Sequence, residues 1–204
     1  MAEGVIMGFD LYGLNPKQNT KPPDGLTKFH DEDGWNKWSE MSDEDSKEYF
    51  NMKDQHEDEN PGNYFRNNVW WWRPLWNYVC VACEDFLTEA DQEKGGYNDG
   101  RNISATKSKR IASRLRKLLK QGDVQSYADE HTKRLANIED EECDLCEGTG
   151  YRVEPPNTGA GDVDCNGCSQ TGKRKPWVTN YPFDVGNVEC FAEFCEQSGG
   201  FTIC

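Results

Sequence analysis

Two pairs of closely spaced cysteines constrain the fold of this chain more than any other feature. Cys143 and Cys146 form the first pair, and Cys165 and Cys168 form the second. A Cys-x-x-Cys unit can form a tight turn that points both sulfurs at one place, and two such units complete a tetrahedron of thiolates. This geometry is typical of structural zinc. We therefore predict that residues 143–172 form an inserted zinc-knuckle hairpin that holds one Zn²⁺.

The glycines around the two pairs favour zinc over the alternatives. Gly148 and Gly150 follow the first pair, Gly167 lies inside the second, and Gly172 follows it. They let the backbone fold closely around an ion. The same ligands could hold an iron–sulfur cluster, or could be ordinary thiols or a redox pair. Because four thiolates would fill a tetrahedral zinc site, no position remains for a water nucleophile, and we expect a structural role.

Cysteine usage and hydropathy also indicate the compartment. The chain has nine cysteines, and an odd number with two paired Cys-x-x-Cys units favours metal thiolates in a reducing cytoplasm over disulfide bonds. Cys80 and Cys83 have the same spacing, but they lie on the apolar stripe of a predicted helix, so we interpret them as core residues. No apolar run is long enough to span a membrane and no signal-peptide pattern opens the chain, so we expect a soluble cytoplasmic protein.

The negative charge is concentrated in one segment. The net charge is −14, and residues 31–60 contribute twelve Asp and Glu against three Lys, a local balance of −9. Nucleic-acid-binding proteins are usually basic, so this charge disfavours nucleic acid as a partner. The sequence favours an acidic loop insert over residues 17–60, ordered in places by aromatic residues. Complete disorder of this segment is the alternative, since charge-rich segments bury little apolar surface.

The rest of the sequence predicts a single α+β domain over residues 1–204. Val5 to Leu11 has the pattern of a buried strand, and residues 201–204 have that of a closing strand. Between them, apolar stripes with helical spacing predict about four helices, which would pack on a small sheet that pairs the N- and C-terminal strands. The first predicted helix has Pro74 in its first turn, and the second runs from a cap at Ser104 to a terminator at Gly122. The third begins near Val124, and the fourth is capped by Asp184.

The aromatic segment 64–79 contains the candidate ligand site. Three consecutive tryptophans, Trp70 to Trp72, cannot all face one way, so at least one is expected to point toward a cleft or a partner. Polar groups nearby could join an exposed ring in a pocket. The alternative is that these tryptophans anchor the core. The candidate residues of the pocket are Arg66, Asn68, Trp71, Arg73 and Asp99.

Two resemblances follow from these motifs. The half-sites CDLCEGTG and CNGCSQTG resemble the Cys-x-x-Cys-x-Gly-x-Gly units in the cysteine-rich region of J-domain co-chaperones, with Gln170 in place of one glycine. Because the chain has no J-domain, this resemblance implies metal binding only. The segments MGFDLYGLNP, YFRNNVWWWRPLW and YPFDVGNVECFAEFCEQSGGFTIC together resemble uncharacterised small proteins of bacteriophages and bacteria. That resemblance implies a bacterial or phage-infected cytoplasm and no particular activity.

These observations predict a zinc-stabilised, non-enzymatic accessory protein that binds a macromolecular partner, another protein, through its acidic segment. An enzyme or small-ligand binder with a pocket in the aromatic segment is the alternative. A nucleic-acid-binding zinc ribbon is disfavoured by the acidic residues 139–144, although Lys173, Arg174 and Lys175 keep it open.

Overall fold

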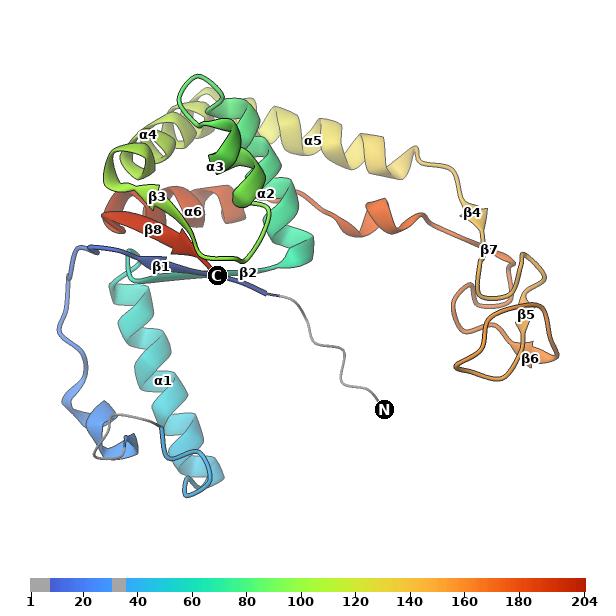
Figure 1. The fold of residues 1–204 in the computed structure, drawn as a ribbon, viewed down its shortest axis with the longest axis horizontal. Coiled ribbons are helices and arrows are strands. Elements are labelled where there is room, and N and C mark those ends of the chain that lie inside the picture. The colour runs from blue at the N-terminus through green and yellow to red at the C-terminus, as the bar shows by residue number, and fades with distance from the viewer. Residues whose placement is uncertain (1–7, 31–35) are drawn as a thin grey trace. The chain divides into compact units, whose positions relative to one another are not determined.

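The computed structural model describes residues 8–30 and 36–204 (Figure 1). The chain divides into two compact units. The first unit contains residues 1–124 and 184–204, so far as they are described, and the second contains residues 125–183. The predicted knuckle segment 143–172 thus lies wholly within the second unit. None of the described helices is long and apolar enough to cross a membrane.

A four-stranded antiparallel sheet organises the first unit. Its strands are β1 (Gly8–Gly13), β2 (Tyr64–Asn68), β3 (Arg101–Ser104) and β8 (Gly200–Ile203), in the order β2-β1-β8-β3. The predicted pairing of the first and last strands is confirmed, with Leu11 opposite Ile203. Residues 5–7 of the predicted first strand lie outside the described residues. The fold class is α+β, as the sequence predicted.

Three helices pack on the sheet and form the core with it: α2 (Val69–Ala82), α4 (Ala105–Gln121) and α6 (Val185–Gln197) (Figure 1). Alternate strand residues point toward these helices and are buried. Phe9 of β1 stacks on Trp72 of α2 at 5.5 Å between ring centroids, and Phe201 of β8 packs against Phe191 of α6 at 5.8 Å. These four rings form one continuous core, because Trp72 also packs against Phe191 at 5.6 Å.

The predicted ends of α4 and α6 are confirmed. The Ser104 hydroxyl accepts the Lys107 N–H at 3.4 Å, and Gly122 ends α4 in the left-handed conformation with φ 82°. The Asp184 carboxylate accepts the Asn187 N–H at 2.7 Å and so caps α6. Each of these boundaries is fixed by a residue close to it in sequence.

The start and length of α2 differ from the prediction. The helix begins at Val69, five residues before Pro74, because the Asn68 side chain accepts the N–H groups of Trp70 and Trp71 at 3.0 and 3.1 Å. Pro74 therefore lies inside the helix rather than in its first turn, where its missing N–H costs least. The apolar stripe after Pro74 also predicts one unbroken helix to about Glu93, and this extent is wrong. Helix α2 stops at Ala82, and α3 (Glu89–Lys94) starts from a new capping box.

The acidic segment is more ordered than predicted. The expected loop over residues 17–60 contains a 3₁₀ helix, η1 (Asp24–Phe29), and a 17-residue helix, α1 (Asp43–Glu59). Ser42 and Asp45 form a reciprocal capping box at the start of α1, where acidic residues also favour the helix dipole. Tyr49 is buried against the rings of Phe29 and Trp38, whereas Trp35 lies outside the described residues.

The second unit consists of most of α5 (Asp123–Ala136), four two-residue strands and a 3₁₀ helix, η2 (Trp177–Asn180). Strand β4 (Glu141–Glu142) pairs with β7 (Lys173–Arg174), and β5 (Tyr151–Arg152) pairs with β6 (Val163–Asp164). Each half-site thus lies between two short strands, and the four strands hold the two half-sites against each other.

Candidate metal centre

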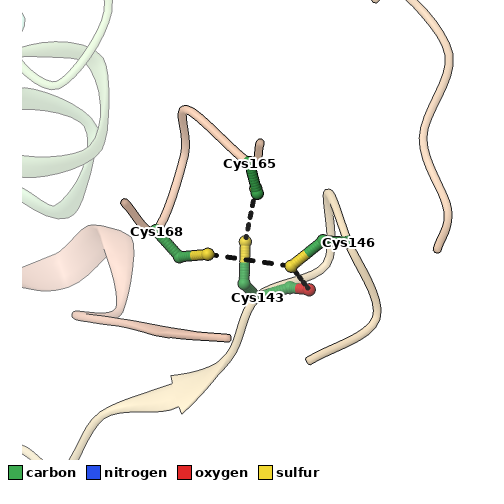
Figure 2. A group of neighbouring side chains, drawn as sticks. All are labelled: Cys143, Cys146, Cys165 and Cys168. Carbon is green, nitrogen blue, oxygen red and sulfur yellow. Dashed lines mark hydrogen bonds between the residues drawn. The ribbon is translucent and has the colours of Figure 1, made fainter. Parts of the chain in front are cut away.

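The four predicted ligands converge in the second unit. The Sγ atoms of Cys143, Cys146, Cys165 and Cys168 all lie within 4.8 Å of one another, and all four residues are buried (Figure 2). The Cys143–Cys165 and Cys146–Cys168 sulfur pairs are 3.8 and 3.7 Å apart. Four sulfurs at about 2.3 Å from a central ion in a tetrahedron lie about 3.8 Å from one another. The arrangement could therefore hold one metal ion.

The two half-sites repeat the same hydrogen bonds across the centre. Gly150 N–H donates to the Cys146 sulfur and Gly172 N–H donates to the Cys168 sulfur, each at 3.3 Å. Cys143 N–H donates to the carbonyl oxygen of Gly172 at 2.9 Å, and Cys165 N–H donates to that of Gly150 at 3.0 Å. Each half-site therefore completes the other, and the repeat seen in the sequence becomes an approximate two-fold symmetry.

Backbone conformation explains two glycines that occupy equivalent positions in the two half-sites, Gly150 and Gly172. Gly150 and Gly172 have φ of 82° and 73°, and a Cβ on them would lie 2.3 and 2.0 Å from a carbonyl oxygen of the opposite half-site. Gly148 (φ 74°) corresponds to Gln170, which has a φ of 67°. Gln170, the residue that departs from the co-chaperone pattern, thus adopts a left-handed backbone conformation that disfavours a side chain.

The thiols of Cys143 and Cys165 differ in pKa. Burial raises the pKa of Cys143 to about 11. Burial acts in the same direction on Cys165, but hydrogen bonds from the N–H groups of Gly167 and Cys168 and from neighbouring thiols lower its pKa to about 7. A bound divalent cation would favour the thiolate form of every ligand and would cross-link the two half-sites. Four thiolates leave no open position for a water ligand on a tetrahedral ion, so the centre is suited to a structural role.

The other Cys-x-x-Cys pair does not belong to a metal-ligand group. Among the described residues, the four-cysteine cluster is the one group of three or more potential ligands close enough together to hold an ion. Cys83 is buried at the end of α2, Cys80 is partly buried, and burial raises the pKa of both thiols to about 12. They are neutral side chains packed in the first unit, as their helical spacing indicated.

The structure brings few of the predicted pocket residues together. Asn68 caps α2, Arg66 lies 3.6 Å from the Asp10 carboxylate, and Asp99 forms an ion pair with Lys94 at 3.1 Å. Trp71 is 37% exposed. Arg73 alone of the five predicted residues lines a hollow of about 340 Å³, together with Trp76, Asn77, Gln92, Glu93, Gly96 and Tyr97.

The packing alternative holds for Trp72 and Trp76. Both are buried, and their indole N–H groups donate to the carbonyl oxygens of Gly95 at 2.8 Å and Gln92 at 2.9 Å. The turn at Gly95 also needs a glycine, because a Cβ there would lie 2.1 Å from the Trp76 ring. The hollow at Arg73 is therefore built on a rigid tryptophan platform.

Sequence reasoning missed one feature of the metal centre. Arg152 and Arg174 occupy equivalent positions, each two residues after the last glycine of its half-site, and both are largely buried. Aligning CDLCEGTGYR with CNGCSQTGKR would have found them.

Comparisons with known proteins find no matching family model, no similar curated protein and no similar solved structure.

Proposed function

We propose that the second unit binds one structural Zn²⁺ through Cys143, Cys146, Cys165 and Cys168. The all-thiolate donor set, the tetrahedral sulfur spacing and the N–H groups directed at two sulfurs support zinc. Elemental analysis of purified protein is expected to give about one zinc per chain, as for a single closed site. Cys143→Ser is expected to lose it. Iron with inorganic sulfide, or a second zinc, would contradict this assignment.

We further propose that the protein is a non-enzymatic accessory factor that binds a protein partner in the cytoplasm of a bacterium or a phage-infected cell. Helix α1 carries this proposal. Its surface is strongly acidic, and Phe50 of the helix stacks at 5.6 Å on Trp38, which precedes α1 in the chain. The Trp38 and Phe50 side chains are 50% and 48% exposed. The helix itself carries two lysines, Lys47 and Lys53, and Lys28 pairs with its Glu48 at 2.6 Å. The acidic residues are Asp43, Glu44, Asp45, Glu48, Asp54, Glu57, Asp58 and Glu59.

This combination fits a protein partner with a basic surface. A few residues supply most of the binding energy in protein interfaces, and Trp is enriched among them. Surrounding charge guides the partner and selects it by sign. Phosphate backbones and anionic lipids would be repelled by the same surface. Helix α1 is also anchored, because Asn60 at its end is buried and accepts the N–H groups of Asn19 and Thr20 at 2.8 and 3.1 Å. A fixed helix presents the two rings with little loss of entropy on binding.

A paired set of variants tests the docking surface. The double variant Trp38→Ala/Phe50→Ala removes both exposed rings and is expected to weaken binding of a partner captured from bacterial lysate, then purified, at least tenfold in calorimetric titration. Raising the salt concentration is expected to weaken the wild-type complex through screening. Arg73→Ala/Tyr97→Ala alters the hollow elsewhere in the first unit and is expected to leave binding unchanged. A partner that binds all variants equally would remove α1 from the function.

The hollow at Arg73 supports one alternative, a small-ligand binder or enzyme. Arg73, Asn77 and Glu93 supply polar groups, and Tyr97 supplies an exposed ring beside them. A thermal-shift screen of anionic and aromatic metabolites would detect such a ligand, since binding to the folded state raises Tm. Stabilisation that disappears in Arg73→Ala/Tyr97→Ala would favour this alternative over the accessory role.

A further inference from the structure

Each half-site is followed by an arginine whose side chain contacts the opposite half-site. Arg152 lies on β5 directly after the first half-site, and its Nη1 donates to Asn166 Oδ1 at 3.0 Å. Arg174 lies on β7 directly after the second half-site, and its Nη1 lies 3.1 Å from Asp144 Oδ1. Asn166 follows the ligand Cys165, just as Asp144 follows the ligand Cys143. Each arginine therefore contacts the residue beside a metal ligand of the opposite half-site.

The two arginines differ in their countercharge. Arg174 has two carboxylates near it, those of Asp144 at 3.1 Å and Glu141 at 3.4 Å. Arg152 is only 5% exposed, and its partners are the neutral oxygens of Asn166 and of the Asn157 carbonyl, the latter at 2.6 Å. Within residues 8–30 and 36–204, no ion pair involves Arg152.

A buried guanidinium without an anion is costly. Arginine does not deprotonate in proteins, and a buried charge is normally paired or bound to a group of opposite sign. The Nε atoms of Arg152 and Arg174 are both buried without a hydrogen-bond acceptor, but only Arg174 Nε has a carboxylate near it, that of Glu141 at 3.4 Å. The charge therefore needs an anion that the carboxylates of the described residues do not supply. The charge of the metal centre itself meets this need, because four thiolates around one divalent cation carry a net charge of −2.

We propose that Arg152 is the countercharge of the metal-loaded cysteine cluster and stabilises its thiolates. The proposal rests on metal binding by the four cysteines. It assigns Arg152 a positioning and electrostatic role, with the metal held by sulfur alone. It also explains the asymmetry of the repeat: Asn166 stands where the other half-site has Asp144, and so leaves the charge of Arg152 free to act on the cluster.

Metal retention in matched variants tests this role. Removing a group that orients or charges a metal ligand from outside the coordination sphere lowers metal affinity by about 10–100-fold. Arg152→Met is therefore expected to lose zinc to a competing chelator about 10–100-fold more readily than wild type. Arg174→Met is the control at the equivalent position, and its effect is expected to be several-fold smaller because Asp144 and Glu141 already neutralise that charge. Arg152→Lys is expected to recover part of the loss.

Asn166→Asp separates charge from packing, because it keeps Arg152 and gives it a carboxylate partner. It is expected to weaken zinc retention in the direction of Arg152→Met. Cobalt substitution provides the second readout: each variant should keep the visible absorption of a tetrahedral thiolate site, which shows that the centre still forms. Equal loss in Arg152→Met and Arg174→Met, or unchanged retention in Asn166→Asp, would overturn the proposal while leaving zinc binding intact. Wild-type protein that binds no metal would overturn both.

Discussion

Gln170 is the position where a single substitution should strengthen the metal centre. Its φ of 67° places it in the left-handed region, and the equivalent residue of the first half-site is Gly148, with φ 74°. The left-handed conformation costs a residue with a Cβ about 1–2 kcal/mol. Glycine removes that cost but loses about 0.5–1 kcal/mol to the greater freedom of the unfolded chain. The Gln170 side chain is exposed and forms no described hydrogen bond, so its removal costs little else.

Gln170→Gly is therefore expected to stabilise the metal-bound second unit by about 0.5–1 kcal/mol. Because folding and metal binding are coupled in such centres, the same change should raise metal affinity about two- to fivefold. The assay is urea unfolding of cobalt-loaded protein, followed by the visible absorption of the thiolate site, which reports this unit and not the first.

Gly148→Gln is the reciprocal control. It places a side chain on a backbone with positive φ, and a Cβ there would lie 2.9 Å from Cγ of Glu142. We expect a loss of more than 1 kcal/mol. Lower stability in Gln170→Gly, or no loss in Gly148→Gln, would refute the inference that backbone conformation decides the residue at this position.

Two further predictions follow from buried charge and thiol ionisation. Asp91 is 1% exposed and binds Arg101 and Lys107, which are partly exposed, so Asp91→Asn should destabilise the first unit by about 2–4 kcal/mol in urea unfolding monitored by tryptophan fluorescence. Asp85→Asn, which breaks exposed pairs only, should cost less than about 1 kcal/mol; equal effects would contradict the argument. Burial acts to raise the pKa of Asp91, but hydrogen bonds from Lys107, Arg101 and Thr88 lower it below the ordinary value. Its stabilisation is therefore present near neutral pH and is lost as the pH falls below about 4, the ordinary Asp range. Metal binding must displace the protons of Cys143, with a pKa of about 11, and below pH 7 also that of Cys165, with a pKa of about 7. As the pH is lowered, metal affinity should therefore fall by about tenfold per pH unit for each displaced proton. Chelator competition at pH 5 to 8 measures this dependence, and an affinity that does not change with pH would contradict the prediction.

The sequence alone determined the features that depend on short-range spacing. Four cysteines with two intervening residues in each pair identified the metal ligands, because the turn that brings two sulfurs together is local. Ser104, Gly122 and Asp184 marked helix ends for the same reason, since a cap contacts backbone groups within a few residues. The pairing of the first and last strands was also predictable, because both are short apolar runs that must bury a face.

The tertiary structure decided what depends on partners distant in sequence. It placed Asn68 at the end of a strand, where it starts α2 earlier than Pro74 indicated, and it ordered α1 through the contact of Tyr49 with Phe29 and Trp38. It also decided how the contacts of Arg152 and Arg174 differ. Their positions can be read from the sequence, but each contacts a residue of the opposite half-site, and only folding brings Asp144 to Arg174 and Asn166 to Arg152.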